Sequence, residues 1–231
     1  MDVIIAFIKG TAPGKWFDRY TEWTDNTLDT YEAVDSWSKL ETGQCDMAFV
    51  RLPDARIDTD NFHCVRLYDE AWGIAMNKDS ELSLLEKVRP SDIAEEIINY
   101  DGYKVTDTLD AMQIVAANVG VCIAPRPLLR AINNKECEHR DFIDDREPTS
   151  IALMWAKDKD CDAYQDFVGI TKGRTKQTSR DSGEKKKAKK PAAKKAPAKK
   201  TTQSKPGAKA QRSGARPGGG ARKGRPTKRR K

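Results

Sequence analysis

Histidine is scarce in this 231-residue chain, which has two histidines and five cysteines. His63 and His139 stand apart from one another, and neither forms a metal-binding spacing with a cysteine. The cysteines are odd in number and show no paired spacing; they are Cys45, Cys64, Cys122, Cys137 and Cys161. Several lie inside apolar runs, so we expect buried thiols in a reducing cytoplasm, no metal site and no cofactor.

Long apolar runs and local catalytic motifs are also missing. No run approaches the roughly eighteen apolar residues of a membrane helix. The apolar stretch 3–8 is too short for a secretory signal and is followed by Lys9. The chain has no Gly-x-Ser-x-Gly elbow, no phosphate-binding P-loop and no dinucleotide glycine fingerprint. We therefore expect a cytoplasmic protein that is not an enzyme and does not enter a membrane.

Acidic and large apolar residues are nearly absent from the last sixty residues. Residues 172–231 contain 24 Lys and Arg against Asp181 and Glu184, a net charge of +22. Residues 1–171 contain 18 basic and 33 acidic residues, a net charge of −15. The tail, 172–231, cannot bury enough apolar area to offset the entropy of ordering, so we expect it to be disordered. Its charge predicts a nucleic-acid partner, DNA first, bound through counterion release.

Two stretches of the tail resemble known DNA-binding tails. Residues 185–200, KKKAKKPAAKKAPAKK, resemble the tails of linker histones and of some actinobacterial nucleoid proteins. The core 223–226 resembles an AT-hook, a family that presents Arg-Gly-Arg to the narrow minor groove of A·T-rich DNA, although the first position here is lysine. We expect association with the nucleoid. The nucleic-acid-binding candidates are Arg222, Lys223, Gly224, Arg225, Pro226, Lys228, Arg229, Arg230 and Lys231.

Apolar runs alternate with helical patterns along residues 1–171, which predicts an α/β fold with a mostly parallel sheet. The predicted strands are 2–8, 28–34, 45–50, 62–67, 71–76, 120–124 and 151–156. The predicted helices are 12–23, a short one around Trp37 and Leu40 that ends at Gly43, 108–118 and 162–171, with one or two helical turns at 91–96.

Three segments in order carry a resemblance to a known family. Residues 40–46 read LETGQCD and precede an apolar strand, residues 105–125 read as helix, turn, strand and proline, and residues 151–156 form a late apolar strand. Together they resemble the effector-binding domain of LysR-type transcriptional regulators, over about residues 2–170. The resemblance implies the two-lobed fold of type 2 periplasmic binding proteins, with a ligand cleft between the lobes.

The resemblance also implies a domain division. Residues 1–171 would form the substrate-binding-like domain, followed by the tail at 172–231. The first lobe would take about 1–67 plus 150–171, and the second about 70–148, joined by two crossing segments.

The chain departs from the family's pattern in three places. It opens in the first strand of the effector domain, without the family's winged helix-turn-helix. Asn118 replaces the usual glycine at the end of a helix, and asparagine tolerates the left-handed conformation well. Between Asp92 and Val105 the chain is short by about a strand–helix unit, which predicts a shortened second lobe and a trimmed ligand cleft.

Family ligands lie where strand ends meet helix N-termini, which is a favourable place for a carboxylate. The corresponding effector-binding candidates here are Lys9, Gly10, Thr11, Arg51, Thr106 and Thr108. Purely structural roles stay open for them, because threonines commonly cap helices and turns, and Lys9 and Arg51 can be solvated strand ends.

Three functions follow from these patterns. The first is a non-enzymatic, regulator-like protein that binds a small carboxylate effector and is tethered to DNA by its tail. The second is a protein-interaction module with a degenerate ligand cleft, and the third is an RNA- or ribosome-associated protein. An open cleft lined by Thr11, Arg51 and Thr106 favours the first, and a cleft filled by side chains favours the second. Whether the body pairs with a second copy to form a homodimer stays open.

Overall fold

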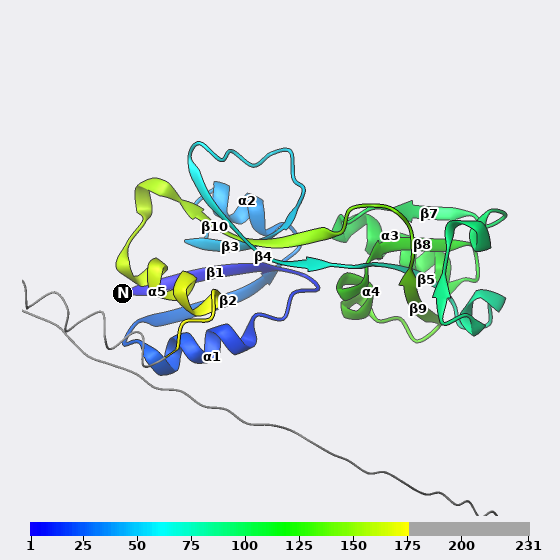
Figure 1. Ribbon diagram of the computed structural model, residues 1–231, viewed down its shortest axis with the longest axis horizontal. Helices are drawn as coiled ribbons and strands as arrows, with labels where there is room; N and C mark the ends of the chain where they lie inside the picture. Colours follow the sequence, from blue (N-terminus) through cyan, green and yellow to red (C-terminus); the bar gives the residue numbers. More distant parts are fainter. Residues whose placement is uncertain (176–231) are drawn as a thin grey trace, which may run out of the picture. The chain divides into compact units, whose positions relative to one another are not determined.

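The computed structural model describes residues 1–175 and contains two five-stranded mixed sheets with helices packed against them (Figure 1). The first sheet has the order β2-β1-β3-β10-β4. Its strands are β1 (Asp2–Ile8), β2 (Thr27–Ala33), β3 (Met47–Leu52), β4 (Phe62–Glu70) and β10 (Thr149–Ala156). Strands β2 and β3 run parallel to β1, whereas β10 is antiparallel to both β3 and β4.

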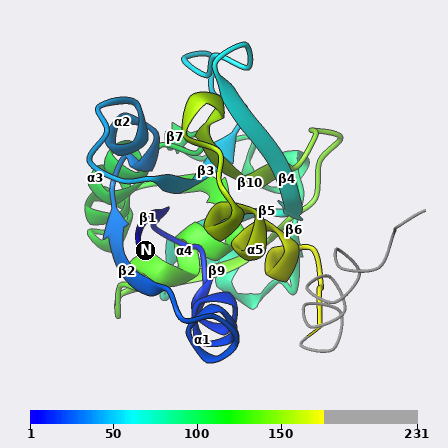
Figure 2. The same cartoon turned by 90° about the vertical axis from the view of Figure 1, so that its left-hand side faces the viewer.

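Helices cover both faces of this first sheet, which explains why β3 is apolar on both sides. Helices α1 (Gly14–Trp23) and α5 (Asp162–Thr171) cover one face, where Tyr20 and Phe167 pack on Phe49 and its neighbours. Helix α2 (Ser36–Glu41) covers the other face, where Trp37 is buried. Figure 2 shows α2 on the opposite side of the sheet from α1 and α5. We call this sheet with its helices lobe I.

The second sheet has the order β6-β9-β5-β8-β7 and forms lobe II. Its strands are β5 (Trp72–Asn77), β6 (Lys87–Val88), β7 (Ile98–Asp101), β8 (Val121–Pro125) and β9 (Cys137–Phe142). Helices α3 (Val105–Ala116) and α4 (Arg126–Ile132) pack on one face. The short 3-10 helices η1 (Glu81–Leu84) and η2 (Pro90–Ile93) pack on the other, and η3 (Lys157–Lys159) follows β10. The chain therefore passes from lobe I to lobe II after β4 and returns before β10.

The prediction of a mostly parallel sheet is wrong, because four of the eight strand pairings are antiparallel. A chain that returns directly from lobe II brings β10 back beside β3 in the opposite direction, without the crossover helix that parallel neighbours need. The predicted gap in the second lobe is also partly wrong. The interval 92–105 contains β7, although it contains no α-helix.

Local backbone predictions can be checked at two positions. Asn118 has φ +61°, so it adopts the left-handed conformation expected of the residue that replaces glycine. Gly120 has φ +63°, and a Cβ there would lie 2.0 Å from the carbonyl oxygen of Ile97. Strand β7 can therefore approach β8 only because residue 120 is glycine.

The expected burial of the cysteines holds for Cys45 and Cys122, which are buried. It is wrong for Cys64, which is exposed because it lies at an outward position of β4. Within residues 1–175, no helix has the length and apolar character needed to cross a membrane. The predictions made for 176–231, including the AT-hook core and its basic flanks, lie outside the described residues.

Candidate functional site

Arg51 lies where β3 ends, and its side chain is buried in an ion pair with Glu70. Its Nε donates to Glu70 Oε2 at 2.6 Å and its Nη2 donates to Glu70 Oε1 at 3.2 Å. The hydroxyl of Thr149 donates to Glu70 Oε2 at 3.2 Å. Strand order explains this meeting, because β10 lies between β3 and β4 and begins with Thr149 opposite Glu70.

One atom of the Arg51 guanidinium is left without a partner. Its Nη2 also donates to the Lys9 carbonyl oxygen at 3.1 Å, but its Nη1 is buried and has no hydrogen-bond partner among residues 1–175. Buried guanidinium donors are normally paired, so the unpaired Nη1 can donate a further hydrogen bond. Arg51 therefore keeps one buried donor after it has paired with Glu70 and with the Lys9 carbonyl oxygen.

Gly10 brings the backbone of lobe I against lobe II beside this ion pair. Its φ is +93°, and a Cβ there would lie 2.9 Å from the Cα of Leu128 on α4 and 3.1 Å from Arg51 Nη2. Ile8 also packs against the lobe II core that contains Leu128. Only glycine allows this approach, so Gly10 holds the end of β1 against both Arg51 and α4.

The remaining predicted residues make mostly local contacts. Lys9 Nζ forms an ion pair with Glu32 at 2.8 Å, and the Thr11 hydroxyl donates to the Ile8 carbonyl oxygen at 2.7 Å. At the start of α3, the exposed Thr106 hydroxyl donates to Asp107 Oδ1 at 2.9 Å. The buried Thr108 hydroxyl donates to the Lys104 carbonyl oxygen at 2.7 Å. The structure thus brings Lys9, Gly10 and Arg51 together and uses both α3 threonines within the helix start.

Sequence reasoning missed Glu70, Thr149 and Leu128. The only local signal for Glu70 is its position between two apolar strands. A carboxylate there becomes buried where the chain crosses between the lobes. The neighbouring Tyr68 lies in the same buried environment, close to the charges of Glu70 and Arg51. Burial, with the Glu70 carboxylate beside it, raises the pKa of Tyr68 to about 12, so its phenol stays neutral.

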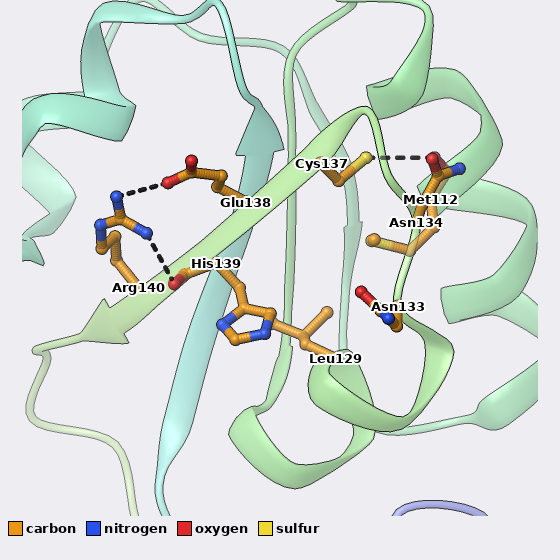
Figure 3. A pocket seen from close by; sticks show the side chains of 8 residues that line it. All are labelled: Met112, Leu129, Asn133, Asn134, Cys137, Glu138, His139 and Arg140. Carbon is orange, nitrogen blue, oxygen red and sulfur yellow. Dashed lines mark hydrogen bonds and ion pairs between the residues drawn. The ribbon is translucent and has the colours of Figure 1, made fainter.

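Two cavities lie elsewhere in the described part of the chain. One of about 490 Å³ lies in lobe I near the crossing segments, among Leu52, Ile57, Cys64 and Pro148. The other, of about 180 Å³, lies in lobe II and is drawn in Figure 3. The six predicted effector-binding residues line neither of these two cavities. Within residues 1–175, no group of three or more His, Cys, Asp or Glu side chains is arranged to hold a metal ion.

Comparisons with known proteins identify the fold. No protein-family model and no curated protein matches the chain. Among solved structures, the BenM effector binding domain with its effector benzoate aligns with a TM-score of 0.59 at 15% identity, over 79% of this chain and 93% of that one. The effector binding domain of QuiR in complex with shikimate aligns with a TM-score of 0.56 at 13% identity, over 74% of this chain and 95% of that one. CbnR, a LysR family transcriptional regulator, aligns with a TM-score of 0.56 at 12% identity, over 74% of this chain and 68% of that one.

These alignments confirm the fold that the three sequence segments predict. Residues of this chain adopt the α/β fold of LysR-type effector-binding domains, with two mixed five-stranded sheets.

Proposed function

We propose that this chain is a non-enzymatic, regulator-like protein whose body, residues 1–171, binds a small carboxylate effector. The observation that carries the proposal is the Arg51 guanidinium, buried at the end of β3 with Nη1 unpaired. Guanidinium groups bind carboxylates through short, charge-assisted hydrogen bonds. Two solved domains of this fold are bound to benzoate and shikimate, and both of these ligands are carboxylates.

The proposed effector site combines both lobes. Arg51 supplies the charge, and the backbone of Lys9 and Gly10 fixes the position of the guanidinium through the carbonyl contact at 3.1 Å. Lobe II contributes Leu128 of α4, which lies against Gly10, whereas the hydroxyl groups of Thr11, Thr106 and Thr108 are engaged in local contacts. An effector carboxylate either binds Nη1 beside Glu70 or takes the place of the Glu70 carboxylate.

The second half of the proposal is that the tail, 172–231, holds the protein on DNA. The support is the charge of +22 carried by the tail against −15 in the body. Flexible chains rich in Lys and Arg contact several phosphates at once and gain affinity through counterion release. The body's charge repels DNA, so the tail would be the anchor.

A thermal-shift titration of the full-length protein with a panel of small carboxylates, at constant ionic strength, tests the effector site. A binding carboxylate raises Tm, because it stabilises only the folded state. Arg51→Lys should abolish that rise, since lysine cannot offer a fork of donors. Arg66→Lys, the same substitution in an exposed ion pair on β4, should leave it intact. A panel in which no carboxylate raises Tm would exclude the effector role.

A protein-interaction module is the second candidate, and the Glu70 carboxylate favours it. Glu70 already occupies two of the Arg51 donors, so an internal group satisfies most of what a ligand would supply. Sequencing the nucleic acid that copurifies with the full-length protein tests the tail. DNA supports the tether, and RNA would instead favour a ribosome- or RNA-associated protein.

A further inference from the structure

A second cavity is lined by residues of lobe II, and Arg51 is not among them. It lies among Met112 of α3, Leu129 of α4, the amides of Asn133 and Asn134, and Cys137 and His139 of β9 (Figure 3). Its volume is about 180 Å³. An engineered protein cavity of about 150 Å³ is large enough to hold benzene, so this one can hold a small organic molecule.

Polar groups without partners lie at and beside this cavity. The Nδ1 atom of His139 is buried and has no hydrogen-bond partner among residues 1–175. The same holds for Nε of Arg126, the first residue of α4. Arg126 also forms an ion pair with Asp141, which lies two residues beyond His139 on the same face of β9. Nearly all buried polar groups in native proteins are paired, so the unpaired His139 Nδ1 in the lining is available to a bound molecule.

The charges around the cavity favour an anion. Arg126 and Arg130 of α4 and Arg140 of β9 surround His139, and burial together with these cations lowers the pKa of its imidazole. The nearby carboxylates are already engaged, Asp141 by Arg126 and Glu138 by Arg140. Met112, which α3 contributes to the lining, is uncharged. The side chain of Arg130, which is exposed and does not line the cavity, forms no hydrogen bond or ion pair within the described part of the chain.

The apolar part of the lining restricts the kind of anion. Met112 and Leu129 belong to the buried core of lobe II, and the Cys137 thiol donates to the Met112 carbonyl oxygen at 3.8 Å. These side chains offer contact to a short hydrocarbon group and no hydrogen bond to a second charged group. A fully hydrated ion such as sulfate gains nothing from such a surface.

We propose that this cavity binds a small monocarboxylate, with its hydrocarbon end against Met112 and Leu129 and its carboxylate toward His139. The site lies in one lobe and does not require the lobes to move. It is independent of the effector site at Arg51, and either site can fail without the other.

The imidazole reports directly on binding, because a carboxylate beside it favours the protonated form and raises its pKa. The chain has only two histidines, so the ring signals of His139 and His63 are separable by NMR. A His63→Gln variant assigns them. The full-length protein is titrated with butanoate at constant ionic strength, balanced with chloride, and the pH titration of each ring is followed with and without saturating ligand.

Butanoate should shift the His139 signals saturably and raise the midpoint pH of its titration, while His63 stays unchanged. Arg130→Gln should weaken butanoate binding by roughly two- to fivefold, the effect of one partly screened charge. Lys15→Gln, which removes the same charge from α1, should leave the affinity unchanged. Two results would overturn the proposal: a His139 signal that does not respond saturably, and a sulfate titration that reproduces the butanoate effect.

Discussion

Breaking the Arg51–Glu70 ion pair from one side should cost far more stability than removing both partners. The two side chains are 1% and 0% exposed, so neither charge can be compensated by water once its partner is lost. Arg51→Met leaves the Glu70 carboxylate with only the Thr149 hydroxyl. Removing one partner of a buried ion pair typically costs about 3–5 kcal/mol of unfolding free energy. We expect losses of that size for Arg51→Met and for Glu70→Leu.

The double variant Arg51→Met/Glu70→Leu should be much more stable than the two single losses imply. Apolar side chains of similar volume can replace a buried ion pair at little cost. What remains is the loss of hydrogen bonds to the Thr149 hydroxyl and the Lys9 carbonyl, roughly 1–3 kcal/mol together. The difference between the double variant and the sum of the single variants is then a favourable coupling energy of several kcal/mol.

Urea unfolding of the full-length proteins, followed by the fluorescence of the five tryptophans, measures all four corners of this cycle. Arg66→Met is the matched control, because its ion pair with Asp69 is more than half exposed on both sides and should contribute almost nothing. The reasoning fails if Arg51→Met unfolds at the same urea concentration as the parent protein. It also fails if the double variant loses as much as both single variants added together.

Three further predictions concern other parts of the chain. A protein cut after Thr171 should keep its cooperative melt, because the buried face of α5 ends at Ile170; a lost transition would assign the tail a role in folding. The lowered pKa of His139 means that the unfolded state protonates first. Stability should therefore fall as pH drops below about 6.5, less steeply in His139→Gln, and parallel denaturation curves would contradict this. Full-length protein should bind duplex DNA with a log–log salt slope of about −0.9 per phosphate contacted, and the 1–171 fragment should not bind. Replacing Arg222, Lys223 and Arg225 with alanine should weaken binding to A·T-rich duplexes more than to G·C-rich ones, and equal losses would leave a nonspecific polycation.

Elements with an unbroken apolar pattern could be predicted to the residue. Strand β1 (Asp2–Ile8) and helix α5 (Asp162–Thr171) match their predicted ranges, because each buries a continuous run or one clear helical face. Strand β9 was missed, since its sequence CEHRDF contains four charged or ionisable polar residues and only one large apolar one. The sequence does not predict helix α4, because Pro125 follows the strand at 120–124 and proline ends many regular elements. Proline lacks a donor that the first turn of a helix does not need, so the prolines at 125 and 127 are compatible with a helix start.

Strand direction and long-range partners could not be read from the sequence. The pattern of β10 is that of a buried strand, which is the same whether its neighbours run parallel or antiparallel. Glu70 is nineteen residues from Arg51, and no periodicity links the two positions. Their meeting depends on β10 returning between β3 and β4, which is a property of the whole topology.

An arginine at a strand end predicts that an anion is bound there. It does not predict whether that anion is a ligand or, as at Arg51, a carboxylate of the same chain. A guanidinium forms the same pair of hydrogen bonds with a ligand carboxylate as with a glutamate of its own chain. An effector that had to displace Glu70 would leave that carboxylate buried and unpaired, a loss comparable to the one expected for Arg51→Met. Binding at the free Nη1 avoids this loss, because Glu70 keeps Nε and Nη2. An effector at this site should therefore bind the Arg51 guanidinium as its second carboxylate, beside Glu70. The Arg51→Lys protein lacks this fork of donors, so it should keep the ion pair with Glu70 and lose the effector.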